Sequence, residues 1–159
     1  MRNPSAYAAL ALLAFAILPA AAQSFEKKTY NYSEWTKGRF SEAVTVAGPA
    51  KMIFLAGVGA EDENGKGGDI LHKGDFTAQC KYAFDKIKRA LAKNGADFGD
   101  VVKMVTYVTD IRYQTEYGAC RRAVFGDAPM PAHTFLNINQ LAWPGMLVEI
   151  DVTAMVPLK

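Results

Sequence analysis

Two stretches of the chain carry apolar residues at the three- and four-residue spacing of a helix. The first spans residues 76–94, follows Asp75 as a natural N-cap and ends at Gly95. The second begins after Asp110 and ends at Gly126. The apolar stripes consist of Phe76, Cys80, Ala83, Phe84, Ile87 and Leu91 in the first stretch and of Tyr113, Tyr117, Cys120 and Val124 in the second. Both stretches are predicted to be amphipathic helices.

The other apolar runs are short and bounded by turn residues, which indicates strands. Residues 40–46 and 52–58 flank an Ala-Gly-Pro-Ala turn and are predicted to form a hairpin. Residues 132–138 and 146–156 flank a turn with the sequence Trp-Pro-Gly. Between the two helices, residues 100–110 read as a strand with apolar side chains on both faces, which is typical of a strand covered on both sides.

This order of elements predicts an α+β fold with two helices on one face of a mixed sheet. Two helices can cover only one face of such a sheet. The doubly apolar strand therefore indicates that the other face is buried by copies of the same chain.

The N-terminal residues have the composition of a secretory signal. Arg2 precedes an apolar run over residues 7–18, and small residues follow, with cleavage expected after Ala22. An uncleaved membrane anchor is the alternative. Cleavage predicts a periplasmic or secreted protein exported by the Sec route, without stable membrane association. It also predicts an extension over residues 23–37 and one folded domain over residues 38–159.

The formal charge of +2 is nearly balanced, and the chain lacks a basic stripe, so nucleic acid is not an expected partner. The pairs Lys27-Lys28 and Arg121-Arg122 are expected to be solvated surface.

The two histidines and two cysteines show none of the close spacings of a metal site, so no metal is expected. Cys80 and Cys120 both fall in predicted helices, and either a disulfide or two buried thiols fits the sequence.

One acid/base pair stands out among the strand residues. His133 and Glu149 lie on two strands joined by a short turn, so antiparallel pairing would bring them together. The alternative is that His133 forms a hydrogen bond with a backbone group and that Glu149 lies on the solvent-exposed face of its strand.

Several motifs together resemble one protein family. The stretches GRFSEAVTVAG, IFLAGVG, ALAKNGADFGDVVKMVTYVTD, PAHTF and VEIDVTA, from about residue 38 to 154, are similar to successive signatures of the RidA (YjgF) family of enamine/imine deaminases. The resemblance implies a chorismate-mutase-like (ferredoxin-like) fold that forms homotrimers with clefts between subunits. It also implies hydrolysis of 2-imino or enamine acids to 2-keto acids and ammonia, without a cofactor.

The resemblance also matches the site residues of the family to individual positions of this chain. Glu149 matches the glutamate that places the hydrolytic water, and Gly57 matches a cleft glycine. His133 stands where deaminating members have the arginine that binds the substrate carboxylate. The remaining cleft positions are Phe40 for a tyrosine, Ala56 for a serine, Gly118 for an asparagine, and Phe135; Arg39 is a candidate replacement cation, or else an exposed strand residue.

These departures leave a more apolar cleft without a fixed, bidentate cation. The first hypothesis is therefore an enzyme that hydrolyses an imine, enamine or related C–N bond in a small molecule without a simple α-carboxylate, unlike the standard 2-imino acids. In this hypothesis Glu149 positions the water, and His133 is an acid/base or a hydrogen-bond donor. The alternatives are a small-molecule-binding trimer without chemistry and a chaperone-like or ribonuclease activity.

Overall fold

The computed structural model describes residues 24–65 and 67–158. The predicted signal segment, residues 1–22, lies outside the described residues. The elements, in chain order, are β1 (Glu26–Tyr30), η1 (Glu34–Thr36), β2 (Ala43–Ala47), β3 (Ala50–Val58), α1 (Phe76–Lys93), η2 (Phe98–Asp100), β4 (Val101–Val108), η3 (Ile111–Tyr113), α2 (Gln114–Phe125), β5 (Ala132–Asn137) and β6 (Val148–Pro157). Among the described residues, no helix is both long and apolar enough to cross a membrane.

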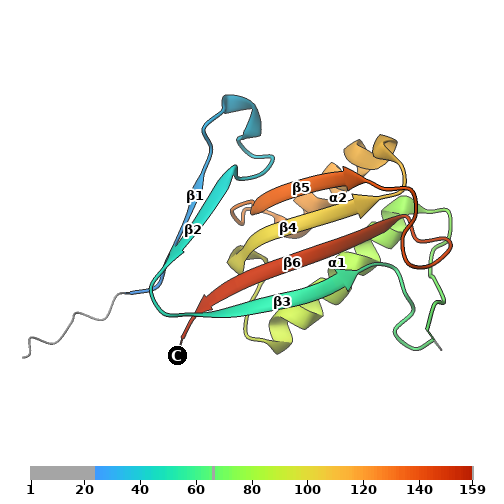
Figure 1. Cartoon of the computed structure of the whole chain (residues 1–159), viewed down its shortest axis with the longest axis horizontal. Helices are drawn as coiled ribbons and strands as arrows, with labels where there is room; N and C mark the ends of the chain where they lie inside the picture. The colour runs from blue at the N-terminus through green and yellow to red at the C-terminus, as the bar shows by residue number, and fades with distance from the viewer. Residues whose placement is uncertain (1–23, 66, 159) are drawn as a thin grey trace, which may run out of the picture.

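A four-stranded mixed sheet in the order β3-β6-β4-β5 forms the body of the molecule. Strand β6 pairs antiparallel with β3 and β4, whereas β5 runs parallel to β4. Figure 1 shows both helices packed behind this sheet. The predicted α+β fold with two helices on one face is thus confirmed.

Strand β6 shows how the sequence separates the two faces of the sheet. Every second residue of β6 from Val148 to Val156 is buried, and the intervening residues are half-buried. The buried set faces α1, whose N-cap Asp75 accepts a hydrogen bond from the Ala78 amide at 2.9 Å. Gly95 has a φ of +74°, which suits a residue that follows a helix C-terminus.

The predicted hairpin between residues 40–46 and 52–58 is wrong. Strand β2 pairs with β1 in a separate two-stranded sheet, and β3 pairs with β6 instead. Figure 1 shows the β1–β2 ribbon extending away from the main sheet. The turn at Gly48, with a φ of +85°, redirects the chain, but a turn signal does not determine which strands pair across it.

The two helices are also linked covalently. Cys80 of α1 and Cys120 of α2 form a disulfide, with their Cα atoms 6.6 Å apart. Both positions are buried in the main core, which also contains the aromatic side chains Phe84, Phe98 and Phe125. The disulfide therefore lies in the apolar layer between the helices and the sheet.

The other face of the sheet carries apolar side chains that are open to solvent in the single chain. Phe54 is 70% exposed and Met52 is 50% exposed, although both lie within a regular strand. Val105 and Tyr107 of β4 lie on the same face and are half-buried. This surface is what an oligomer interface formed by the open face would cover.

Candidate functional site

A cavity of about 670 Å³ lies between β5, α2 and the loop before β2. It contains the predicted site residues Arg39, Phe40, Gly118, His133 and Phe135. Strand β5 is an edge strand, so its residues reach the cavity without a neighbouring strand in the way. These five predicted residues come from three separate segments of the chain and line one site.

The loop over residues 31–42 forms one wall of this cavity and is fixed by polar contacts. The Asn31 side chain donates to the Phe40 carbonyl at 2.7 Å, and the Ser41 hydroxyl donates to the Met130 carbonyl at 2.6 Å. Glu42 accepts hydrogen bonds from the Ser33 amide and hydroxyl. Desolvation acts to raise the pKa of Glu42, but hydrogen bonds from Ser33 and its neighbours lower it overall. The wall thus has a defined position before any ligand binds.

His133 lies at the centre of a closed hydrogen-bond network. Its Nδ1 is 2.6 Å from Arg121 Nη1, and its Nε2 is 3.1 Å from Thr106 Oγ1 and 3.3 Å from Tyr117 OH. A guanidinium only donates, so Nδ1 accepts and the proton resides on Nε2. Burial, followed by the charges of Arg121 and Lys103, lowers the pKa of His133 to about 3. The imidazole is therefore neutral, with both nitrogens engaged.

Arg121 was not among the predicted site residues. It was expected to be solvated surface, yet it is only 6% exposed, whereas Arg122 is exposed. Its Nη2 donates to the Arg39 carbonyl, and its guanidinium lies 5.6 Å from the centre of the Tyr117 ring. The sequence signal for the burial of Arg121 was its position on α2, next to the apolar-stripe residue Cys120. This signal is too weak to distinguish a buried arginine from one whose charged end extends into solvent.

Glu149 lies on the opposite face of the sheet from His133, and the predicted antiparallel juxtaposition of the two is wrong. Strand β4 lies between β5 and β6, with Tyr107 paired to Glu149 and Met104 paired to His133. The sequence marked two strands joined by a turn, but it did not reveal that a third strand enters between them. Within one chain, His133 and Glu149 therefore belong to different surfaces.

Gly57 and Ala56 accompany Glu149 on that second surface. Both are exposed in β3, and a Cβ at Gly57 would overlap the Glu149 carboxylate. The carboxylate thus lies directly against the Gly57 backbone, which only glycine allows. Burial, followed by the charges of Glu61 and Asp151, raises the pKa of Glu149.

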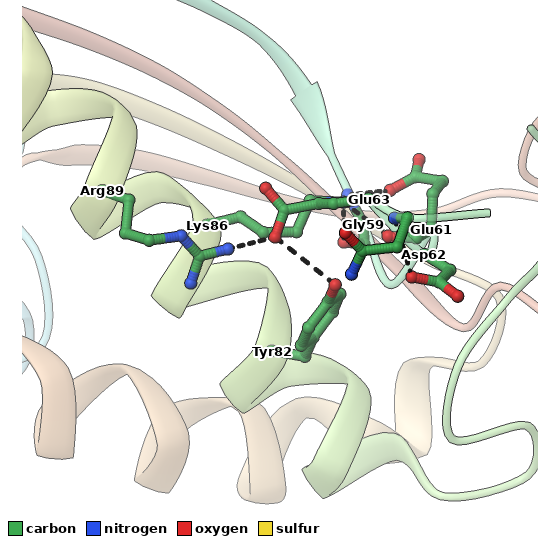
Figure 2. Close-up of polar contacts among 8 residues, drawn as sticks. Gly59, Glu61, Asp62, Glu63, Tyr82, Lys86 and Arg89 are labelled. Carbon is green, nitrogen blue, oxygen red and sulfur yellow. Dashed lines mark hydrogen bonds and ion pairs between the residues drawn. The ribbon is translucent and has the colours of Figure 1, made fainter.

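The loop after β3 places Glu61 near Glu149, and Lys86 of α1 holds this loop. Lys86 Nζ donates to the Gly59 carbonyl at 3.1 Å and to Glu61 Oε2 at 2.9 Å. Figure 2 shows this contact beside a second one, in which Glu63 binds Arg89 and Tyr82. Two ion pairs from α1 therefore fix the loop that borders the Glu149 surface.

Metal ligation has no candidate site in the described parts of the chain. Within residues 24–65 and 67–158, no three His, Cys, Asp or Glu side chains come together as a metal-binding group.

Comparisons with known proteins identify the family. Residues 33–156 match the family model described as Endoribonuclease L-PSP. The chain belongs to the Rid (YjgF) family. It is 28% identical to the RutC family protein YjgH of Escherichia coli, over 79% of this chain and 89% of that protein. It is 31% identical to Protein DfrA of Myxococcus xanthus, over 74% of this chain and 86% of the relative.

Solved structures of Rid proteins have the same fold. A Yersinia pestis member described as a protein of unknown function matches with a TM-score of 0.71 and 28% identity, over 82% of this chain and 98% of its own. A member of the YjgF/YER057c/UK114 family from Mycobacterium tuberculosis matches with a TM-score of 0.55 and 30% identity, over 82% of this chain and all of its own. Homotrimers are typical of the family.

Proposed function

We propose that this Rid protein is an exported, cofactor-free hydrolase that acts on an imine, an enamine or a related C–N bond of a small molecule. The observation that carries the proposal is the division of the candidate site into two surfaces. The cavity beside α2 has binding groups but no carboxylate among its lining residues, and Glu149 lies on the open face, outside that cavity. Each surface is incomplete in one chain.

A homotrimer that packs the open face of one subunit against the cavity edge of the next would join the two surfaces. The exposed side chains of Met52 and Phe54 favour burial of that face. Phe54 lies on β3 two residues before Ala56 and three before Gly57, whose backbone contacts the Glu149 carboxylate. Burying Phe54 would therefore bring Glu149 of one subunit toward the cavity of its neighbour.

Hydrolysis in such a cleft needs only a water molecule and a base. Glu149 accepts a proton from water as the water oxygen bonds to the carbon of the C=N group, and the nitrogen takes up a proton to give a carbinolamine. The nitrogen is then protonated again, and the C–N bond breaks as the hydroxyl group loses its proton and becomes the C=O group, so the nitrogen leaves as ammonia. Burial raises the pKa of Glu149 and so strengthens it as a base toward neutral pH. In this scheme His133, with both nitrogens engaged, is a positioning residue rather than a proton carrier.

Ammonia release tests this function. Imines generated in situ by an amino-acid oxidase would be supplied to the mature protein, and ammonia would be followed against the uncatalysed rate. We expect Glu149→Gln to lower the enzymatic rate by about 100-fold or more, in the range of a lost general base. Gly57→Ala should also lower the rate, because its methyl group displaces the carboxylate, while the melting temperature stays within a few degrees.

The proposal would be contradicted if ammonia were released from none of the imines, or if the rate were unchanged in Glu149→Gln.

The second candidate is a trimer that binds small molecules without chemistry. The engaged nitrogens of His133 favour it, because they leave the cavity in one chain without a free base. Ligand-induced thermal stabilisation that is equal in wild type and Glu149→Gln, without turnover, would support this candidate.

A further inference from the structure

The buried guanidinium of Arg121 has no carboxylate partner among the described residues. The ion pairs of the structure involve other cations, and the groups that contact Arg121 are an imidazole, a backbone carbonyl and an aromatic ring. A buried cation without a counter-charge is costly unless an anion comes to it. Arg121 is 6% exposed, so bulk water provides little compensation.

The guanidinium also has unused hydrogen-bond donors. It carries five N–H groups, and two of its nitrogens make one contact each, with His133 Nδ1 and the Arg39 carbonyl. The Nε atom is buried and has no partner within the described part of the molecule. Because Arg121 lines the cavity, the remaining N–H groups of its two Nη atoms are the donors that a ligand in the cavity would meet.

The rest of the cavity combines apolar walls with a positive rim. Trp35, Phe40, Tyr117 and Phe135 supply aromatic surface, and Arg39 and Arg122 add exposed cations. The volume of about 670 Å³ exceeds the needs of a three-carbon acid and falls within the range of small-molecule sites. The aromatic rings thus favour the apolar end of a ligand, and the cations favour an anionic group at its other end.

We infer that Arg121 is the anion-binding residue of the cavity, and that the ligand is an organic carboxylate with an aromatic or similarly large apolar body. The expectation of a substrate without a carboxylate came from the missing arginine at position 133. Arg121 brings a guanidinium to the same cavity from α2 instead of β5. This inference rests on the proposed function for the identity of the site, but not for any chemical step.

His133 is the positioning residue for this guanidinium. Its Nδ1 accepts from Arg121 Nη1, while Thr106 and Tyr117 hold the Nε2 side of the ring. Such a fixed acceptor orients the planar guanidinium of Arg121 toward the ligand before the ligand binds. An arginine at position 133 would place a second positive charge against Arg121, which explains why a neutral residue stands there.

Equilibrium binding of phenylpyruvate to the intact mature protein tests the inference. Calorimetry would compare phenylpyruvate with its uncharged methyl ester and with pyruvate. We expect the acid to bind at least 10-fold more tightly than either probe. Arg121→Met should weaken phenylpyruvate binding by 10-fold or more and leave ester binding within twofold. Arg112→Met is the matched control, since it removes an exposed arginine of η3 that does not line the cavity, and it should change binding less than threefold.

Positioning by His133 has its own readout. His133→Asn offers Oδ1 in place of Nδ1 as an acceptor and should retain phenylpyruvate binding within about threefold, whereas His133→Leu should lose about as much as Arg121→Met. Both variants should keep the affinity for the methyl ester, which a general loss of structure would reduce.

Three results would each overturn the inference. The first two are equal affinity of the wild type for phenylpyruvate and its ester, and unchanged phenylpyruvate affinity in Arg121→Met. The third is dissociation of the assembly in Arg121→Lys, because Arg121 would then serve a contact between subunits. Turnover of imines without preference for a carboxylate would refute this inference alone. Binding that follows Arg121 without any turnover would refute the proposed hydrolysis alone.

Discussion

At the scale of single residues, the environment of His133 determines its charge. Arg121 donates to one ring nitrogen, and the pKa of about 3 follows from burial and from the charges of Arg121 and Lys103. The sequence gives a histidine after Pro-Ala, but an isolated histidine at this position is compatible with a base, a cation or a neutral acceptor. The contact with α2 selects the neutral acceptor.

This low pKa predicts a pH-dependent stability. The unfolded histidine titrates near pH 6.5, whereas the folded one stays neutral down to about pH 3. The unfolded state therefore binds the extra proton in this window, so the stabilisation is complete above pH 6.5 and declines as the pH falls toward 3, by about 1.4 kcal/mol per pH unit.

Urea unfolding at several pH values between 7.5 and 5 measures the effect. The stability advantage of wild type over His133→Asn should shrink as the pH falls below 6.5, because the carboxylates common to both proteins cancel in the difference. A difference that is constant across this range would show that His133 titrates normally in the folded state.

At the scale of elements, the periodicity of the sequence predicted both helices and most strands. Asp75 and Gly95 bound α1, and Gly126 follows α2, as local capping rules require. The pairing of strands was less accessible, because β2 pairs within the N-terminal ribbon and β4 lies between β5 and β6. Period and turn residues act over a few positions, whereas pairing depends on contacts between distant segments.

The disulfide between α1 and α2 gives a prediction at this scale. It closes a loop between residues 40 positions apart, and its loss should lower the free energy of unfolding by about 2 to 4 kcal/mol. Chemical denaturation of the Cys80→Ser/Cys120→Ser variant, compared with wild type produced in the bacterial periplasm, measures this loss.

Thiol labelling provides the control. Denatured wild type should react with two equivalents of an alkylating reagent only after reduction. Two reactive thiols before reduction would contradict the disulfide.

At the scale of the whole molecule, the open face of the sheet explains why the candidate site is divided. One face is covered by α1 and α2, and the other exposes Phe54 and Met52 and also carries Glu149. The apolar residues on both faces of β4 already indicated that something must cover the open face of the sheet. The bulge near the start of β4 and the strand order determine which residues lie on that open face.

Replacing Phe54 with Asp should therefore dissociate a trimer without unfolding its subunits. The charge would have to be buried without a partner, whereas in the isolated chain Phe54 is already 70% exposed. Light scattering should report the mass of one subunit at micromolar concentration, with the circular dichroism spectrum of wild type.

Ile111→Asp is the matched control, because Ile111 is 49% exposed and lies in η3, between β4 and α2, rather than in a strand of the sheet. It should retain the mass of wild type. A Phe54→Asp protein that stays trimeric would place the interface elsewhere, and imine hydrolysis by a stable monomer would contradict a site shared between subunits.

The sequence by itself determined the helices, the existence of most strands, the α+β class and the family, because periodic burial, caps and motifs are encoded in neighbouring residues. It also marked His133, Glu149 and Gly57 as candidates for the site. The tertiary structure alone decided that His133 meets Arg121 rather than Glu149, and that Arg121 is buried rather than solvated. These outcomes depend on the order of strands and on the packing of α2 against β5, which bring together residues that no local pattern relates.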